Sequence, residues 1–218
     1  MKTCLESNVV RLLAGLREIR EFWERRTEKW SEKAPLHIGK GWIYNWLMTR
    51  AHRKQLKKVL KFCKPESVLE MGVGQGRLLS QVRSDVKVGV DVAINMIKSC
   101  QKDGSELVQA DANHLPFRDK CFVLVYTCTA LLHIPDNRIE LAISEIKRVA
   151  KEYILIIEPL PTFQHITRPY SEGGYCFPHK YPDLFKMLII SRRTLKKFSH
   201  EAILFTNKTG KNINSVSL

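Results

Sequence analysis

The sequence lacks paired cysteines, long apolar runs and, towards both ends, acidic residues. Its six cysteines are scattered and form no C-x-x-C pair. This argues against a metal site or a disulfide framework and favours a reducing compartment. No apolar run approaches the ~18 residues of a membrane span. Arg11, Arg17 and Arg20 interrupt the first apolar stretch, so we expect no signal peptide, a cytoplasmic location and no membrane contact.

Because acidic residues are scarce in the flanks, the net charge of +14 is uneven. Residues 1–65 hold 16 Lys and Arg against 6 Asp and Glu, and residues 159–218 hold 9 against 3. Residues 66–158 hold 11 against 13. Basic flanks favour an anionic substrate or an acidic partner. A lysine-rich surface that is merely solvated explains the same numbers equally well.

A glycine-rich turn follows the first apolar strand, and the rest of the chain is arranged around it. Residues 68–69 lead to Glu70, after which Gly72, Gly74 and Gly76 alternate with other residues. Glycine lets the backbone turn sharply and approach a ligand closely, because no Cβ intervenes. A strand before such a turn is typical of dinucleotide folds with G-x-G-x-x-G. The spacing here is G-x-G-x-G, with a carboxylate two residues before it.

Three further strands end in polar residues. Residues 87–91 end at Asp91, where a carboxylate can accept both ribose hydroxyls of a nucleoside cofactor, NAD included. Residues 106–112 end in Ala-Asp-Ala around Asp111, and residues 122–127 run into L-L-H-I-P-D at 131–136. In this order the four segments resemble the class I S-adenosylmethionine-dependent methyltransferases, whose first motif is E/D-x-G-x-G-x-G. One departure is Val123, because the family commonly has Asp there.

The resemblance implies a site for S-adenosylmethionine and methyl transfer by in-line displacement. Gly72, Gly74 and Gly76 would pass beneath the methionine part of the cofactor, and Glu70 would help to hold its ammonium group, directly or through water. Asp91 would bind the ribose. Asp111 and the amide of Ala112 would bind the adenine. The plainer alternatives are that Asp111 caps a turn and that Glu70 pairs with an arginine.

A general base is needed only if the acceptor arrives protonated. The candidates are His133 after the fourth strand, and Tyr175 and His179 in a later loop, although a structural role is at least as common for such residues. A reaction that uses thiols would need several cysteines close together, and Cys128 and Cys176 are too few to predict one.

The pattern of strands and helices predicts a doubly wound α/β fold with a mostly parallel, seven-stranded sheet and an N-terminal helical extension. We expect the helical extension, which could also act as a lid, at residues 1–65. The methyltransferase domain is expected at residues 66–218, with a substrate loop at 159–182. Asp136 is the expected N-cap of a helix at 137–150. The other expected helices lie at 5–30, 76–83 and 94–102, and a further helical pattern runs through residues 56–62 until Pro65. The expected strands lie at 67–71, 86–91, 106–110, 121–127, 153–157, 187–191 and 201–207.

For the acceptor we expect a small metabolite, with an anionic one favoured by the charge. Nucleic-acid base methylation is disfavoured, because the position after the fourth strand reads T-C-T-A, neither D/N-P-P-Y nor Pro-Cys. Methylation of RNA or protein, without these base-methylation motifs, is the alternative activity. A non-catalytic scaffold that binds the cofactor is the second alternative. The sequence does not indicate an oligomeric state.

Overall fold

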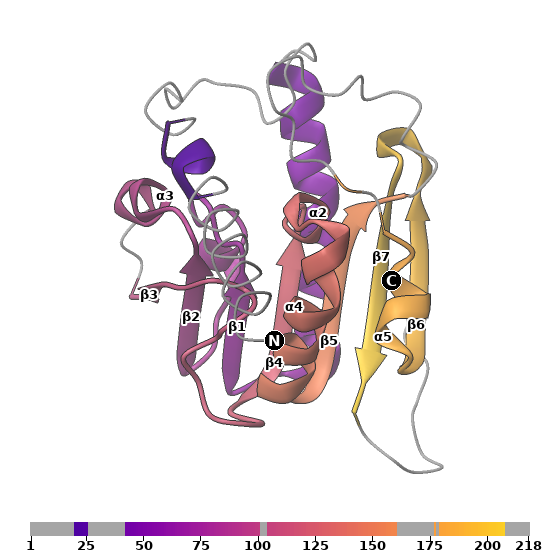
Figure 1. Cartoon of the computed structure of the whole chain (residues 1–218). Coiled ribbons are helices and arrows are strands. Elements are labelled where there is room, and N and C mark those ends of the chain that lie inside the picture. The colour runs from indigo at the N-terminus through magenta and orange to yellow at the C-terminus, as the bar shows by residue number, and fades with distance from the viewer. Residues whose placement is uncertain (1–19, 26–41, 101–103, 161–176, 178, 208–218) are drawn as a thin grey trace.

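One seven-stranded sheet runs through the protein in a computed structural model that describes residues 20–25, 42–100, 104–160, 177 and 179–207. The strand order is β3-β2-β1-β4-β5-β7-β6, and β7 alone runs against the others, pairing antiparallel with β5 on one side and with β6 on the other (Figure 1). This confirms the expected doubly wound, mostly parallel sheet. The strands are β1 (Ser67–Met71), β2 (Val86–Asp91), β3 (Glu106–Gln109), β4 (Phe122–Cys128), β5 (Ala150–Pro159), β6 (Leu188–Leu195) and β7 (His200–Thr206).

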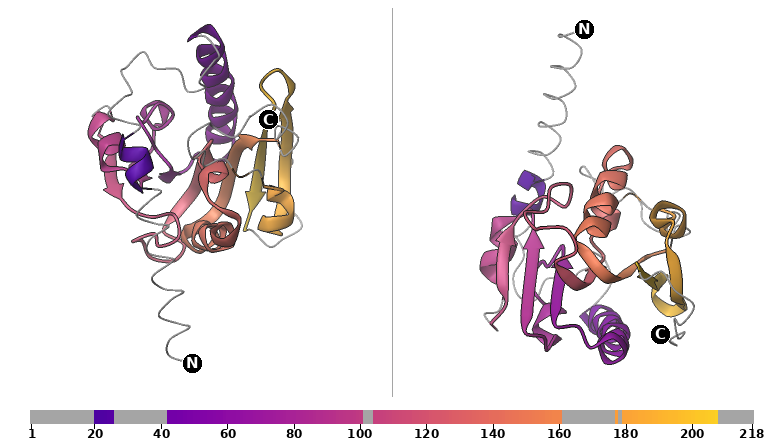
Figure 2. Two further views of the ribbon diagram at one scale, coloured as in Figure 1. Left: turned by 45° about the horizontal axis from the view of Figure 1, so that its top comes forward. Right: turned by 90° about the horizontal axis from the view of Figure 1, so that it is seen from below.

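Helices cover both faces of the sheet. The helix α2 (Trp42–Cys63) lies on one face, and α4 (Asp136–Val149) lies on the other with α5 (Tyr181–Phe185), as the right view of Figure 2 shows. Alternate residues of β5 serve the two sides: Ile154 and Ile156 join the core beneath α4 and α5, while Leu155 and Ile157 join the core beneath α2. Strands buried on both faces are the reason that β4 and β5 read as continuous apolar runs.

The strand order reverses between β1 and β4. From β1 the chain moves outwards through β2 and β3, and it then returns to the other side of β1 with β4. Glu70 lies opposite Gly89 on one side and Tyr126 on the other. In open α/β sheets, ligands bind outside the carboxyl ends of the strands at such a reversal. The loops after β1, β2 and β4 therefore frame the candidate site.

The helix expected at 76–83 is wrong. Only a 3₁₀ turn, η1 (Leu79–Gln81), forms there. In an α-helix the amide of Gln81 would donate to the carbonyl of Arg77, but here it donates to Leu78 at 2.9 Å. The carbonyl of Arg77 instead accepts Nε and Nη2 of Arg53 on α2, at 3.3 and 3.0 Å. A contact from a distant helix thus replaces the intrahelical bond.

Two other boundaries differ from expectation. The helix α4 begins at Asp136 itself, with Pro135 at its N-cap, so Asp136 is not the cap. The predicted loop 159–182 overlaps β5, which extends to Pro159, and the start of α5 at Tyr181. Residues 161–176 of that loop lie outside the described residues.

The remaining helical expectations are met in part. The helix α3 (Ile94–Ser99) occupies the predicted segment 94–102, and residues 20–25 are helical within the predicted segment 5–30. The strands β6 and β7 occupy the predicted segments 187–191 and 201–207, and they pair antiparallel. Whether residues 1–65 form a separate extension stays a prediction, and so does the cytoplasmic location. None of the described helices has the length and apolar character needed to cross a membrane.

Candidate functional site

The glycine turn after β1 lies at the carboxyl edge of the sheet. Gly72, Gly74 and Gly76 all have positive φ, at 74°, 51° and 73°. A Cβ on Gly72 would lie 2.3 Å from Cβ of Ala130, and one on Gly76 would lie 2.2 Å from Sγ of Cys100. A Cβ on Gly74 would meet nothing within 4 Å. Gly72 is therefore needed for packing against Ala130, the Cys100 thiol can turn away from a side chain at position 76, and Gly74 faces open space.

Asp91 at the end of β2 is tied to this turn. Its Oδ2 accepts the amide of Gly74 at 2.9 Å, and its Oδ1 accepts the amide of Ala93 at 3.0 Å. Burial raises the pKa of its carboxyl, and these amides oppose that rise. Each carboxylate oxygen has a second lone pair, so Asp91 can hold the turn and still accept two ligand hydroxyls. The predicted ribose-binding residue thus lies beside the glycine turn.

Glu70, two residues before Gly72, is buried in the α2 face of the sheet, with 3% of its surface exposed. Its Oε2 accepts the hydroxyl of Tyr126 on β4 at 2.8 Å. Burial raises the pKa of Glu70 to about 8, against the lowering effect of the Tyr126 hydrogen bond. At neutral pH this carboxyl is mostly protonated, and an ammonium group nearby would favour its ionised form.

Asp111, just after β3, has a partner that the sequence reasoning missed. Its Oδ1 accepts the amide of Asn113 at 3.0 Å, and its Oδ2 accepts Nη2 of Arg138 at 2.7 Å. The Arg138 side chain is only 8% exposed. Asp111 therefore caps a turn, as the plainer alternative has it. Remaining lone pairs leave room for a ligand donor, so its adenine role, like that of the partly buried Ala112, stays a prediction.

The three candidate bases are placed differently. His179 is buried, with Nε2 2.9 Å from the carbonyl of Ile134 and Nδ1 3.4 Å from Oδ1 of Asp136, and burial lowers its pKa. His133 ends the 3₁₀ turn η2 (Leu131–His133), where Trp23 packs against its ring edge-on at 4.5 Å. Tyr175 lies outside the described residues.

Glu158 near the end of β5 is a buried carboxyl residue beside the candidate site that sequence reasoning did not select. It is fully buried, and its Oε1 accepts the hydroxyl of Thr127 and the amides of Ala130 and Leu131, at 2.8–3.1 Å. Burial raises its pKa to about 7. Ala130 is also the residue that faces Gly72. Glu158 thus fixes the loop after β4 against the glycine turn. In the sequence, the signal that could have identified Glu158 is its position as a carboxylate at the end of an apolar strand.

Cys128 does not offer thiolate chemistry. Its Sγ lies 3.2 Å from Nδ1 of His52 on α2, and burial raises its pKa well above the ordinary value of a thiol. Thiols react as thiolates, so this partly buried cysteine is not a candidate nucleophile. Cys176 lies outside the described residues.

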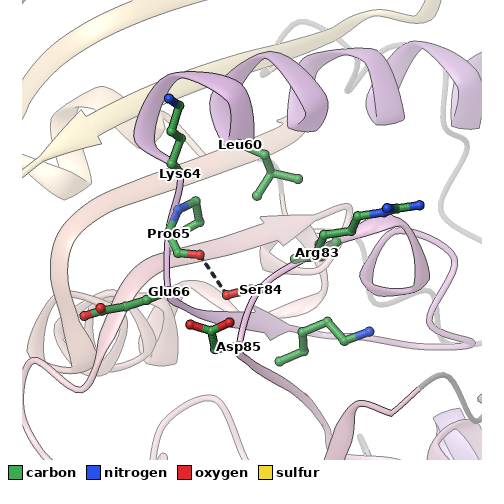
Figure 3. A pocket seen from close by; sticks show the side chains of 9 residues that line it. Leu60, Lys64, Pro65, Glu66, Arg83, Ser84 and Asp85 are labelled. Carbon is green, nitrogen blue, oxygen red and sulfur yellow. Dashed lines mark hydrogen bonds between the residues drawn. The ribbon is translucent and has the colours of Figure 1, made fainter.

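A solvent-open hollow of 660 Å³ lies elsewhere, between the end of α2 and the start of β2 (Figure 3). Lys64, Glu66, Arg83 and Asp85 surround it, and the hydroxyl of Ser84 donates to the carbonyl of Pro65 at 2.8 Å. These residues flank the amino ends of β1 and β2. The hollow is therefore at the opposite edge from the glycine turn and Asp91, and we do not assign the chemistry to it.

Comparisons with known proteins match the segment that carries the glycine turn. A family model described as a methyltransferase domain matches residues 68–153. A tRNA (carboxymethyluridine(34)-5-O)-methyltransferase of Arabidopsis thaliana is 34% identical over 85 residues, 38% of this chain and 21% of that protein. An uncharacterized protein of Methanocaldococcus jannaschii is 36% identical over 92 residues, 41% of this chain and 44% of that protein. The chain thus spans less than half the length of these curated relatives.

Among solved structures, the fold is similar to that of magnesium protoporphyrin IX methyltransferase from Synechocystis PCC 6803 with bound S-adenosylhomocysteine. The TM-score is 0.65 at 14% sequence identity, and the match covers 87% of this chain and 97% of the other. The matched segment 68–153 contains the glycine turn and both strand-end aspartates. In its motifs, in its sheet topology and in the family match over residues 68–153, this chain is similar to the class I S-adenosylmethionine-dependent methyltransferases.

Proposed function

We propose that this protein transfers a methyl group from S-adenosylmethionine to a nucleophilic acceptor. The observation that carries the proposal is Asp91, which ends β2 and accepts the amide of Gly74 from the glycine turn at 2.9 Å. This places a carboxylate and an open backbone turn at the reversal of strand order. The cofactor supplies a methyl group that its sulfonium charge has already activated, so the protein's task is positioning and exclusion of water.

In this proposal each site residue acts on one part of the cofactor. The glycine turn lies beneath the methionine part, and Asp91 accepts the ribose hydroxyls. Asp111 and the amide of Ala112 hold the adenine, while Arg138 orients Asp111 from α4 at 2.7 Å. Glu70 compensates the ammonium group. Its buried position and the Tyr126 hydroxyl are compatible with that role if the carboxyl loses its proton on binding.

Among the candidate bases, His133 is the first to test. Both ring nitrogens of His179 already lie near oxygen atoms of Ile134 and Asp136, so abstraction of a proton by His179 would require one of these contacts to break. Tyr175 remains a candidate in the loop before α5. A protonated acceptor would need one of these groups, whereas an acceptor that is already ionised would need none.

The acceptor class has two candidates. The first is a small metabolite, anionic by preference, which the basic flanks favour through electrostatic attraction. The second is RNA, favoured by the similarity of 85 residues to a tRNA methyltransferase and by a cationic face of α2, argued below. Protein methylation has no observation of its own in its favour.

The test is incubation with donor labelled in the methyl group, together with pools of small acids and of RNA. We expect S-adenosylhomocysteine to accumulate and label to enter one pool with the wild type but not with Asp91→Asn. Asparagine retains an acceptor for one of the two amides, so circular dichroism and thermal unfolding check that the variant folds. Cofactor binding without transfer to any pool would instead indicate the non-catalytic scaffold.

A further inference from the structure

The exposed face of α2 carries a row of cations. Exposed lysine and arginine side chains recur at three- and four-residue intervals, which places them on one side of a helix. The helix contains no Asp or Glu. At 1.5 Å per residue the row is about 21 Å long. We call it the α2 stripe, and it consists of Arg50, Lys54, Lys57, Lys61 and Lys64.

Further cations lie near both ends of α2. Tyr44 near the start of α2 packs edge-on against Phe198, at 5.5 Å between ring centroids. Phe198 ends the 3₁₀ turn η4 (Lys196–Phe198), whose two lysines are exposed. At the other end, Lys64 shares the hollow of Figure 3 with Arg83 and Lys87, and Glu66 and Asp85 there offset part of the charge.

An aromatic side chain begins the stripe on the side of the candidate site. Trp46 is 52% exposed, and the guanidinium of Arg50 lies 5.3 Å from the centre of its ring. His52, less than two turns further on, contacts Cys128 at the carboxyl end of β4. From there α2 runs to Cys63, and β1 starts at Ser67 at the amino edge of the sheet. The stripe therefore leads from the amino edge of the sheet up to the edge that holds the glycine turn.

We propose that a single-stranded or loop segment of RNA binds along the α2 stripe, with phosphates on the cations and one base stacked on Trp46. A cationic groove or row with an aromatic platform is how proteins hold single-stranded nucleic acid, and RNA is recognised mostly through unstacked bases. The inference deepens the proposed function, because RNA held there would be led to the methyl-transfer edge.

An anionic membrane surface fits the same charge less well. A helix that lies in a membrane interface needs a continuous apolar face. The apolar face of α2 is used inside the protein, where Met48, Leu56 and Val59 are buried. Ile43 and Trp46 are its exposed large apolar residues among those described. The exposed side is cationic for about 21 Å and apolar only at one end.

The test is fluorescence anisotropy of a labelled 12-nucleotide single-stranded RNA, in the absence of cofactor, from 50 to 200 mM salt. Five phosphate contacts predict a slope of about −3.5 for log affinity against log salt, and about 100-fold weaker binding over this range. The variant Lys54→Gln/Lys57→Gln/Lys61→Gln removes three contacts. Its slope is expected to fall to about −1.4, with at least ~10-fold weaker binding at 50 mM.

The matched control is Arg118→Gln/Lys120→Gln/Lys186→Gln, which removes the same charge from three exposed positions outside α2 and outside the expected substrate loop. It should leave affinity and slope nearly unchanged. Trp46→Ala should weaken binding about 10-fold at every salt concentration without changing the slope. Equal weakening by both triple variants would overturn the inference, and so would binding to anionic vesicles without binding to RNA. Because no cofactor is present, failure here is distinguishable from failure of methyl transfer.

Discussion

Replacing the glycines of the turn one at a time separates packing from ligand contact. In Gly72→Ala the new methyl group would lie 2.3 Å from Cβ of Ala130, at a φ of 74°. We expect a loss of about 3 kcal/mol, from about 1–2 kcal/mol for the left-handed backbone and about 1–3 kcal/mol for overpacking. In a chain of 218 residues this lowers Tm by about 6–12 °C.

Gly74→Ala has the same kind of backbone strain but no neighbour within 4 Å. It should lower the free energy of unfolding by only ~1 kcal/mol, which corresponds to a Tm lower by about 2–4 °C. If the cofactor passes over the turn, the methyl group would instead intrude on the ligand. A saturating ligand at 100 times Kd stabilises the folded state by about 2.7 kcal/mol, and this variant should lose most of that gain.

The assay is differential scanning calorimetry of wild type and both variants, with and without S-adenosylhomocysteine. The reasoning predicts opposite profiles: Gly72→Ala is destabilised on its own, whereas Gly74→Ala is nearly as stable as wild type but insensitive to the ligand. If Gly74→Ala keeps the full ligand-induced shift, the cofactor does not lie over the turn. If Gly72→Ala melts like wild type, the contact with Ala130 is not a packing constraint.

Three further outcomes follow from the buried charges. Because burial raises the pKa of Glu70 to about 8, the folded state keeps a proton that the unfolded state releases. The free energy of unfolding should thus fall as pH rises from about 4.5 to 8, by up to ~1.4 kcal/mol per pH unit. Glu70→Gln should flatten that slope in urea denaturation at several pH values. An unchanged slope would contradict the raised pKa of Glu70. Glu158→Ala removes the acceptor of three donors and should lower the free energy of unfolding by about 3 kcal/mol. Glu158→Gln keeps an acceptor oxygen and should lower it clearly less in the same denaturation assay. Equal losses of stability would refute the role of Oε1. Arg138→Ala removes a charged hydrogen bond to Asp111, whose side chain is 24% exposed, and should cost about 1.5–3 kcal/mol. Calorimetry should show weaker cofactor binding than in the wild type at a temperature where both are folded.

The sequence predicted the parts of this fold that depend on local pattern. Apolar runs ending at Glu70, Asp91 and Thr127 marked strands whose carboxyl ends meet at one edge, and the glycines marked the turn between them. These signals are short in range, because a buried parallel strand must be apolar and a turn with positive φ favours glycine.

What the sequence did not predict depends on contacts between distant residues. Arg53 donates to the carbonyl of Arg77 from 24 positions away, where the expected helix would use that carbonyl for its own backbone bond. Arg138 reaches Asp111 across 27 positions, and Glu158 reaches Thr127 across 31. No local pattern encodes such pairs. The chemistry of the site was therefore predicted from motifs, whereas the residues that hold it in place required the structure.

The most direct test of the central claim is calorimetric titration of the protein with S-adenosylmethionine and S-adenosylhomocysteine. Asp91→Asn serves as the comparison, with circular dichroism to show that it is folded. The account predicts micromolar binding of both compounds by the wild type and at least ~10-fold weaker binding by the variant, or ~1.4 kcal/mol. A folded wild-type protein that binds neither compound would contradict the account, and NAD would then be the next ligand to titrate.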